Sequence, residues 1–194
     1  MKQLIGIVTE GIEDIAAQEV DGQKKEQGRI SFKQEKKEYR AIDTVYECEE
    51  EFSFETMEDI LAQVKKRKWQ IIPPFRVTCR REGDHLFRAT DIERDCGEII
   101  YKQGYAVDLK NPKTTIFFDI KDQTCAMGRL LQKDLQKRVY RVRRNNAGIS
   151  ATLAAALIKI AKAAPEESLF DPYCKDGVIA IEAVRQGFQE VYAT

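Results

Sequence analysis

The stretch that decides the fold is FRVTCRREGDHLFRATDIERDCGEII, residues 75–100. Its first part, 75–81, alternates apolar and polar side chains as a half-buried strand does, and Pro73-Pro74 favours extended backbone just before it. Thr90-Asp91-Ile92-Glu93 is a capping-box pattern, which predicts a helix from Asp91 to about Gly104. The apolar residues of that helix recur at helical spacing. A strand followed by a helix is therefore the first predicted unit.

The flanking sequence extends this unit in both directions. We expect strands at 105–109 (YAVDL) and 114–120 (TTIFFDI), and TCAMGRLL at 124–131 is expected to pair with the second of them. Upstream, Thr56 is expected to cap a helix with apolar residues at 57, 60, 61 and 64. The pattern of residues 3–8 predicts a buried strand. Thr9 is expected to cap a helix that extends to Val20, and residues 29–34 and 45–54 are expected to form two further strands. The predicted class is α/β, with an α+β N-terminal part.

Beyond residue 131 the chain changes character. KRVYRVRR at 137–144 predicts a basic strand, and Ser150 is expected to cap an alanine-rich helix. SLFDP at 168–172, a helix from Gly177 to Gly187 and QEVYAT at 189–194 then give strand, helix and strand. That order predicts a parallel βαβ unit, the start of a doubly wound sheet. An unfinished sheet leaves a free edge, so an oligomer formed through this segment is one expectation.

Composition narrows the classes of partner. The 32 basic and 32 acidic residues cancel, which excludes an argument from global charge, but the charges are segregated locally. Residues 47–59 carry seven acids and no base, whereas 65–81 and 129–144 are strongly basic, a pattern typical of phosphate contacts. Five scattered cysteines and one histidine predict neither a disulfide framework nor a metal site, and fit a cytoplasmic protein. No apolar run approaches the ~20 residues of a membrane span.

A longer pattern surrounds the opening stretch. Its residues are Phe75, Val77, Arg80 or Arg81, Gly83, His85, Phe87, Thr90, Asp91, Ile92, Gly97, Val107, Leu109, Pro112, Ile116 and Phe118. In this pattern the middle of the chain resembles the THUMP domain, an RNA-binding module; Lys113 stands where the family has an aspartate. TEGIEDIAAQEV, residues 9–20, is similar to the ferredoxin-like domain that precedes THUMP in many members. The resemblance covers roughly residues 1–130. It implies that the partner is an RNA, and transfer RNA is the first candidate.

The C-terminal part carries a second resemblance. YRVRRNNAGISATLAAALIKIA at 140–161 and DPYCKDGVIAIEA at 171–183 resemble the beginning of the Rossmann-type domain of THUMP-containing RNA methyltransferases, the tRNA guanine-N2 group especially. In that family an Asp-Pro-Phe-Cys-Gly-Ser-Gly loop holds S-adenosylmethionine. The implied cofactor residues are Asp171, Pro172, Cys174 and Gly177, while Lys175 and Asp176 depart from the motif. Asp176 is as well explained as a cap of the following helix. The family's Asp-Pro-Pro-Tyr motif is absent, so no catalytic residue is assigned.

The prediction divides the chain into four parts: a ferredoxin-like domain over 1–54, a THUMP domain over 55–131, a basic linker over 132–149, and the first βαβ unit of a Rossmann-type methyltransferase fold over 150–194. Candidate RNA contacts are Lys66, Arg67, Lys68, Arg76, Arg80, Arg81, Arg88, Arg138, Arg141, Arg143 and Arg144. For each of those from Lys66 to Arg88 a solvated face is an equally good interpretation. His85 is expected to pack in a turn, Trp69 in the core, and Glu182 to face solvent or a neighbouring helix.

Three functions follow from this division. The first is RNA recognition, most readily of transfer RNA, as part of a S-adenosylmethionine-dependent RNA methyltransferase, and this chain alone is expected to bind without catalysing. The alternative is a non-catalytic RNA-binding adaptor whose degenerate loop has lost the cofactor, with a partner enzyme supplying the chemistry. A third interpretation makes 139–194 a packing or dimerisation element.

Overall fold

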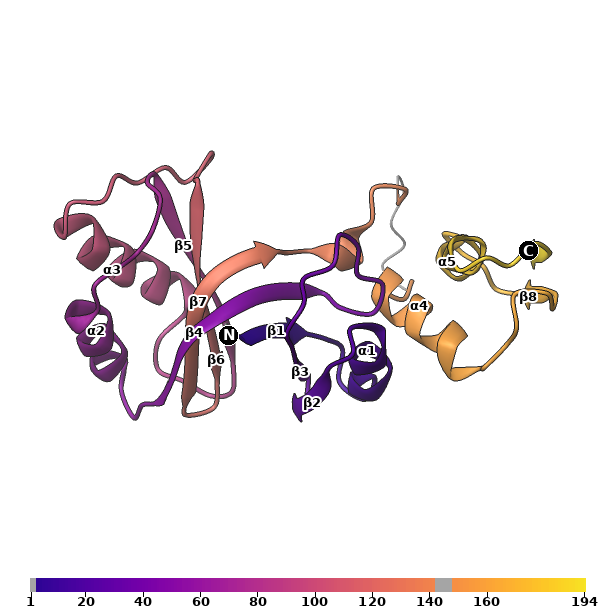
Figure 1. Ribbon diagram of the computed structural model, residues 1–194, viewed down its shortest axis with the longest axis horizontal. Helices are drawn as coiled ribbons and strands as arrows, with labels where there is room; N and C mark the ends of the chain where they lie inside the picture. Colours follow the sequence, from indigo (N-terminus) through magenta and orange to yellow (C-terminus); the bar gives the residue numbers. More distant parts are fainter. Residues whose placement is uncertain (1–2, 142–147) are drawn as a thin grey trace. The chain divides into compact units, whose positions relative to one another are not determined.

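The computed structural model describes residues 3–141 and 148–194, and Figure 1 shows the path of the chain. These residues fall into two compact units. Gln3–Val45 and Gln132–Thr194 form the first unit, and Tyr46–Leu131 form the second. The predicted four-part division at residues 54, 131 and 149 stays a prediction.

The second unit is a mixed sheet with two helices on one side of it (Figure 1). Its strand order is β4-β7-β6-β5, and β5 is parallel to β6 while β6 is antiparallel to β7. The strands are β4 (Thr44–Ser53), β5 (Phe75–Glu82), β6 (Thr114–Lys121) and β7 (Thr124–Gln132), and the helices are α2 (Met57–Lys66) and α3 (Ala89–Lys102). The parallel pair is joined through α3, as a crossover connection requires.

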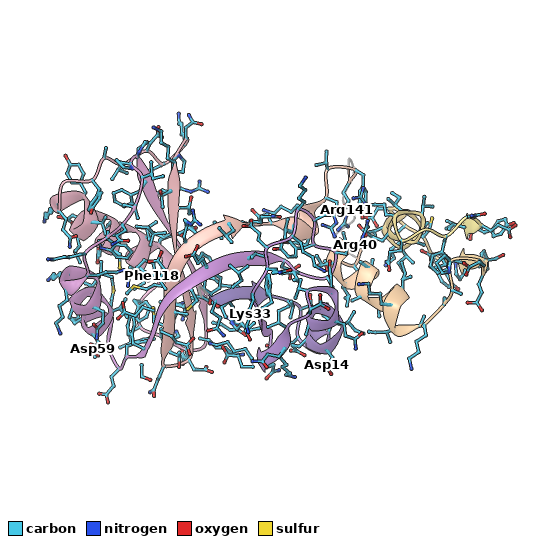
Figure 2. All side chains as sticks on the ribbon, viewed as in Figure 1. Asp14, Lys33, Arg40, Asp59, Phe118 and Arg141 are labelled. Atoms are coloured by element: carbon cyan, nitrogen blue, oxygen red, sulfur yellow. The ribbon has the colours of Figure 1, made fainter. Side chains whose placement is uncertain are left out.

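The core of this unit lies between the sheet and the helices. Alternate residues of β5, Phe75 and Val77, face the buried side chains Ile60 of α2 and Ile92 of α3. Phe118 of β6 is fully buried among them, whereas Asp59 lies at the surface where α2 begins (Figure 2). The apolar spacing predicted for both helices is thus the spacing of their buried faces.

The starts of the two helices differ in how well the sequence predicts them. At α2 the predicted cap is confirmed, because the Asp59 carboxylate accepts a hydrogen bond from the Thr56 N–H at 2.9 Å. Helix α3 begins two residues earlier than predicted. Asp91 accepts from the Arg88 N–H at 2.8 Å, so Arg88 and not Thr90 is the capping position. Glu93 is engaged elsewhere, since it accepts from the Cys79 N–H of β5 at 2.8 Å.

The strand predicted over 105–109 is wrong. Only Val107 forms a bridge there, parallel to Phe75. The Asp108 carboxylate accepts hydrogen bonds from the N–H groups of Lys110 and Asn111, at 2.8 and 3.0 Å. This local side-chain turn competes with strand extension and leads the chain into β6.

The first unit begins with β1 (Gln3–Ile7), α1 (Glu13–Glu19), β2 (Gln23–Glu26) and β3 (Arg29–Phe32). The three strands are antiparallel in the order β2-β3-β1, followed by the start of β4. The strands predicted over 3–8 and 29–34 and the helix between them are confirmed, whereas β2 lies where no strand is predicted. Thr9, however, does not cap α1, which starts after Ile12 without a side-chain cap.

The rest of this unit comes from the C-terminal segment, with the short helix η1 (Leu135–Lys137), α4 (Ala151–Ile160), β8 (Leu169–Asp171), α5 (Val178–Arg185) and β9 (Val191–Ala193). Ser150 caps α4 as predicted, accepting from the Leu153 N–H at 3.1 Å. Strands β8 and β9 are parallel around α5, which confirms the predicted βαβ unit. In its described part, the strand predicted over 137–144 is replaced by η1 and a turn. Among the described helices none combines the length and the apolarity needed to cross a bilayer.

A buried carboxylate holds the start of α1 to the β2–β3 turn. Glu13 is 3% exposed, and one of its oxygens accepts from the Gly28 N–H at 2.7 Å. It also accepts from the Gly11 N–H at 3.2 Å and from the Lys24 ammonium at 3.3 Å. Burial opposes ionisation of Glu13, but these hydrogen bonds outweigh it and lower its pKa from 4.5 to about 2.

We expect Glu13→Gln to lower the free energy of unfolding by about 1–3 kcal/mol at pH 7, because hydrogen bonds to a charged group are lost. The pKa of Glu13 is lowered on folding, so its stabilisation is present above about pH 4.5 and is lost as the pH falls towards 2. The difference between the two proteins in urea unfolding should therefore shrink over that range. Asp14→Asn, an exposed change in the same turn, is the control; an equal effect of both changes would contradict the assignment.

Candidate nucleic-acid interface and cofactor loop

One end of the second unit gathers cations from three separate segments. The carboxyl end of α2 lies beside the carboxyl end of α3, because the Gln103 amide donates to the Lys65 carbonyl at 3.4 Å. The loop before β6 joins the start of β5 through the Lys113 N–H, which donates to the Pro74 carbonyl at 2.7 Å. We call this region the basic end. Its cations are Lys65, Lys66, Lys68, Arg76, Lys110 and Lys113.

The cations of the basic end keep their charge uncompensated. None of the six forms an ion pair with a residue in the described part of the chain. Lys66, Lys68 and Lys113 are exposed. Arg76 is half-buried and donates to the Thr115 hydroxyl at 3.3 Å and to the Leu109 carbonyl at 3.5 Å, which leaves its cation without a carboxylate. Such an arrangement can contact phosphate oxygens.

The sequence prediction missed Lys110 and Lys113. Both stand far along the chain from the run at 65–68 and look like isolated loop charges. The parallel pairing of β5 with β6, in which Arg76 lies opposite Thr115, is what places these two lysines at the basic end. Since parallel strands start at the same edge, the loop before β6 must lie next to the start of β5.

Other predicted contacts are already neutralised or lie elsewhere. Arg67 pairs with Glu49 and, at 2.6 Å, with Glu50, and it lies 5.0 Å above the ring of Trp69, which is a core residue as expected. Arg80 pairs with Glu82 at 3.7 Å. Arg81 and Arg88 lie at the carboxyl end of β5, away from the basic end, and Arg81 donates to the Gly83 carbonyl at 2.8 Å.

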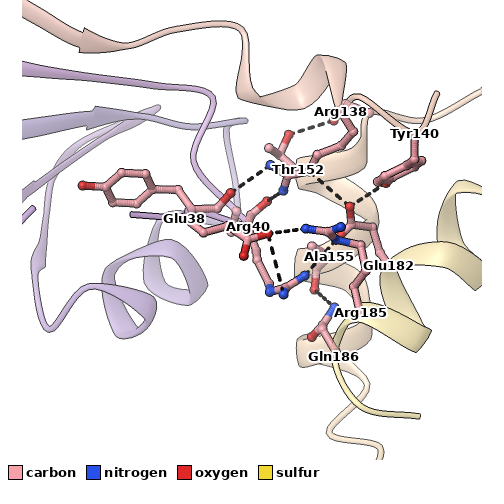
Figure 3. A network of polar contacts seen from close by, with 12 residues as sticks. Glu38, Arg40, Arg138, Tyr140, Thr152, Ala155, Glu182, Arg185 and Gln186 are labelled. Atoms are coloured by element: carbon pink, nitrogen blue, oxygen red, sulfur yellow. Dashed lines mark hydrogen bonds and ion pairs between the residues drawn. The ribbon is translucent and has the colours of Figure 1, made fainter. Parts of the chain in front are cut away.

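The two described arginines of the predicted basic linker are not on the surface. Arg138 is 9% exposed and pairs with Glu182 at 3.1 Å, and its other nitrogens donate to the Tyr39 and Arg40 carbonyls at 2.9 Å (Figure 3). Arg141 is 8% exposed and pairs with Asp176 at 2.5 Å. Their assignment as RNA contacts is therefore corrected, because acids far along the chain engage them. Arg143 and Arg144 lie outside the described residues.

Glu182 is the centre of this polar network (Figure 3). It is fully buried, so of its two predicted environments, solvent and a neighbouring helix, solvent is excluded. It accepts from the Tyr140 hydroxyl at 2.5 Å and lies 3.6 Å from Arg40. Burial, followed by the hydrogen bond to Glu182, raises the pKa of Tyr140 above its ordinary value of 10. The network ties α5 to residues 38–40 of the same unit.

The predicted cofactor residues form the loop between β8 and α5. Asp171 is buried at the end of β8 and accepts from the Tyr173 N–H at 3.1 Å. The Cys174 N–H donates to the Thr194 carbonyl at 3.1 Å, which ties the loop to the end of β9. Lys175 and Gly177 have φ of +47° and +69°, in the left-handed region where a lysine is disfavoured. Asp176 does not cap α5, because its carboxylate pairs with Arg141.

The backbone of this loop fits a cofactor-holding role. The first N–H groups of α5 have no partner within the helix, and they face the loop that follows β8. A Cβ at Gly177 would meet nothing closer than the Ile181 side chain at 4.0 Å, so the turn is open. A ligand at the carboxyl end of a parallel strand and the N-terminus of the next helix is the usual arrangement in such folds. Within the described ranges no cluster of His, Cys, Asp and Glu is arranged to hold a metal.

Comparison with known proteins agrees with both parts. Residues 54–128 match the THUMP domain, and residues 138–192 match the RMKL-like methyltransferase domain. The chain therefore carries a THUMP domain together with part of a methyltransferase domain. A tRNA (guanine(6)-N2)-methyltransferase of Archaeoglobus fulgidus is 30% identical over 201 residues, covering 91% of this chain and 51% of that protein.

Two further relatives come from Thermus thermophilus. A tRNA (guanine(6)-N2)-methyltransferase is 34% identical over 111 residues, which cover 56% of this chain and 33% of that protein. The crystal structure of TrmN has a TM-score of 0.74 at 25% identity, and the match covers 100% of this chain and 65% of that one. The two sequence relatives described here are both tRNA guanine-N2 methyltransferases, and this chain spans a third to a half of their length.

We expect Glu182→Ala to lower the free energy of unfolding by about 3–5 kcal/mol, because it leaves buried Arg138 without its counter-charge. Urea unfolding followed by circular dichroism measures the effect. Glu166→Ala removes an exposed carboxylate from the same segment and should change stability by less than about 0.5 kcal/mol. Equal stability of the two variants would show that the network does not hold this unit together.

Proposed function

We propose that the chain is the RNA-recognition part, with the first cofactor loop, of a S-adenosylmethionine-dependent RNA guanine-N2 methyltransferase, and that its RNA is transfer RNA. The observation that carries this proposal is the basic end of the THUMP domain. Its six cations are unpaired within the described residues, although the chain has no net charge. The names of the relatives support the choice of reaction and of RNA.

The chemistry of the basic end suits a phosphate backbone. Lys66 is the last residue of α2, Lys68 lies two residues beyond it, and Lys113 lies in the loop before β6, so the cations are attached to a rigid scaffold. Ammonium groups that neutralise phosphates release counterions, which makes affinity fall steeply with salt. Contacts of this kind position an RNA without reading its bases. The choice of nucleotide then belongs to the methyltransferase part.

The loop from Asp171 to Gly177 is the proposed site for S-adenosylmethionine, which supplies the methyl group when bound. Asp171 and the N–H groups at the start of α5 would hold the cofactor, and the left-handed turn at Gly177 lets the backbone come close to it. The side chain of Asp176 is turned to Arg141 and so fixes the shape of the loop instead of contacting a ligand.

Replacing Lys66 and Lys68 together by alanine should weaken binding of a transfer RNA transcript. The slope of log affinity against log salt should become shallower by about 1.4 to 1.8, because two phosphate contacts are lost. Fluorescence anisotropy at several salt concentrations measures both quantities. The paired control is Lys33→Ala with Lys37→Ala, two exposed lysines of the first unit. Parent affinity that does not change between about 50 and 200 mM salt would contradict the proposal.

The adaptor alternative rests on Lys175, whose left-handed backbone is disfavoured for a residue with a Cβ. If the loop binds S-adenosylmethionine, Lys175→Gly should relieve that strain and tighten binding about two- to fivefold in isothermal titration. Asp171→Asn should weaken it. Absence of binding by both the parent chain and Lys175→Gly would favour the adaptor, with RNA affinity left intact.

A further inference from the structure

A cavity of about 740 Å³ opens in the second unit at the end opposite the basic end. It is lined by the start of α2, by the turn after β5 and by the β6–β7 turn. The Phe54 N–H donates to the Gln123 carbonyl at 3.0 Å and holds two of these walls together. The volume is in the range of sites that accept a small ligand or a few side chains.

The floor of this cavity is aromatic. The rings of Phe54 and His85 stack with centroids 5.8 Å apart, and Phe87 lies 5.0 Å from His85. His85 donates from Nε2 to the Asp122 carbonyl at 2.5 Å and accepts at Nδ1 from Arg81 at 2.9 Å. The prediction that His85 packs in a turn is confirmed. Leu86 stands fully exposed beside these rings.

The rim is acidic. Glu55, Glu58, Asp84 and Asp122 line the cavity and are exposed. None of the four carboxylates forms an ion pair with any residue at 3–141 or 148–194. The helix dipole accounts for an acid in the first turn of α2, such as Glu58, but not for Asp84, which lies in the turn after β5. An aromatic floor under unpaired carboxylates attracts cations through both charge and the ring faces.

We propose that this cavity is a docking site for a basic segment of a partner protein, with an apolar side chain on the aromatic floor and flanking lysine or arginine side chains against the rim. Charge complementarity selects this occupant. Four carboxylates repel phosphate, so an RNA backbone belongs at the other end of the domain. The exposed Leu86 offers an apolar surface that the side chain of a bound partner segment can cover.

The test is a titration of the ¹⁵N-labelled full chain with the peptide acetyl-Lys-Arg-Leu-Arg-Lys-amide, followed by amide chemical shifts. We expect saturable shifts confined to residues 54–58, 84–87 and 122–123. Glu58→Gln combined with Asp84→Asn should weaken the peptide about three- to tenfold, because two exposed ion pairs are lost. Glu35→Gln with Glu166→Gln removes the same charge from exposed sites of the other unit and should leave binding unchanged.

Unchanged spectra of the rest of the domain show that the charge variants remain folded. Shifts that spread over the whole surface, or that titrate with undiminished affinity in the Glu58→Gln, Asp84→Asn variant, would overturn the proposal. So would stronger shifts at the same residues with the peptide acetyl-Glu-Glu-Leu-Glu-Glu-amide or with an RNA trinucleotide, since either would assign the cavity to another class of ligand. None of these outcomes depends on the basic end or on the cofactor loop.

Discussion

Parallel pairing of β5 with β6 is the constraint on which the second unit depends. Eight consecutive residues of each strand stay in register, from Phe75 opposite Thr114 to Glu82 opposite Lys121. Two parallel neighbours require a crossover, and α3 supplies it on the face that α2 also covers. Both strands therefore start at one edge and end at the other. The segments next to the strand starts form the basic end. The turns that follow the strand ends line the aromatic cavity.

The candidate phosphate contacts are the cations that have no carboxylate partner among the described residues. The chain has equal numbers of acids and bases, so a cation free of a carboxylate is informative. Arg67, Arg138 and Arg141 pair with acids that are distant in sequence, and the pairs of Arg138 and Arg141 are buried. Lys66 and Lys68, at the carboxyl end of α2, form no ion pair with any described residue. A buried pair and a solvated cation look the same in a run of letters, but only the second can exchange its counterions for phosphate.

Prediction from sequence succeeded at the caps of α2 and α4. It failed where the partner is distant, and also where a local turn or an alternative cap competes, as over 105–109 and at Thr90. The capping of α2 by Thr56 and Asp59, the cap at Ser150 and the βαβ order after it follow from neighbouring residues. The predicted strand over 137–144 has the right letters for a strand, yet Glu182 and Asp176 draw its arginines inward. Lys113 escaped notice for the same reason, because strand pairing and not sequence spacing places it at the basic end.

The two ends of the THUMP domain can act independently of each other. Eight residues of β5 at about 3.3 Å each separate them by roughly 26 Å. That separation exceeds the Debye length of about 8 Å at physiological salt, so the acidic rim does little to weaken phosphate binding at the basic end. The proposed RNA contacts and the proposed basic protein segment would therefore use separate ends of one domain. Coupling between the basic end and the cavity would have to pass through the core formed by β5, β6 and α3. That core is closely packed, so its elements can shift little.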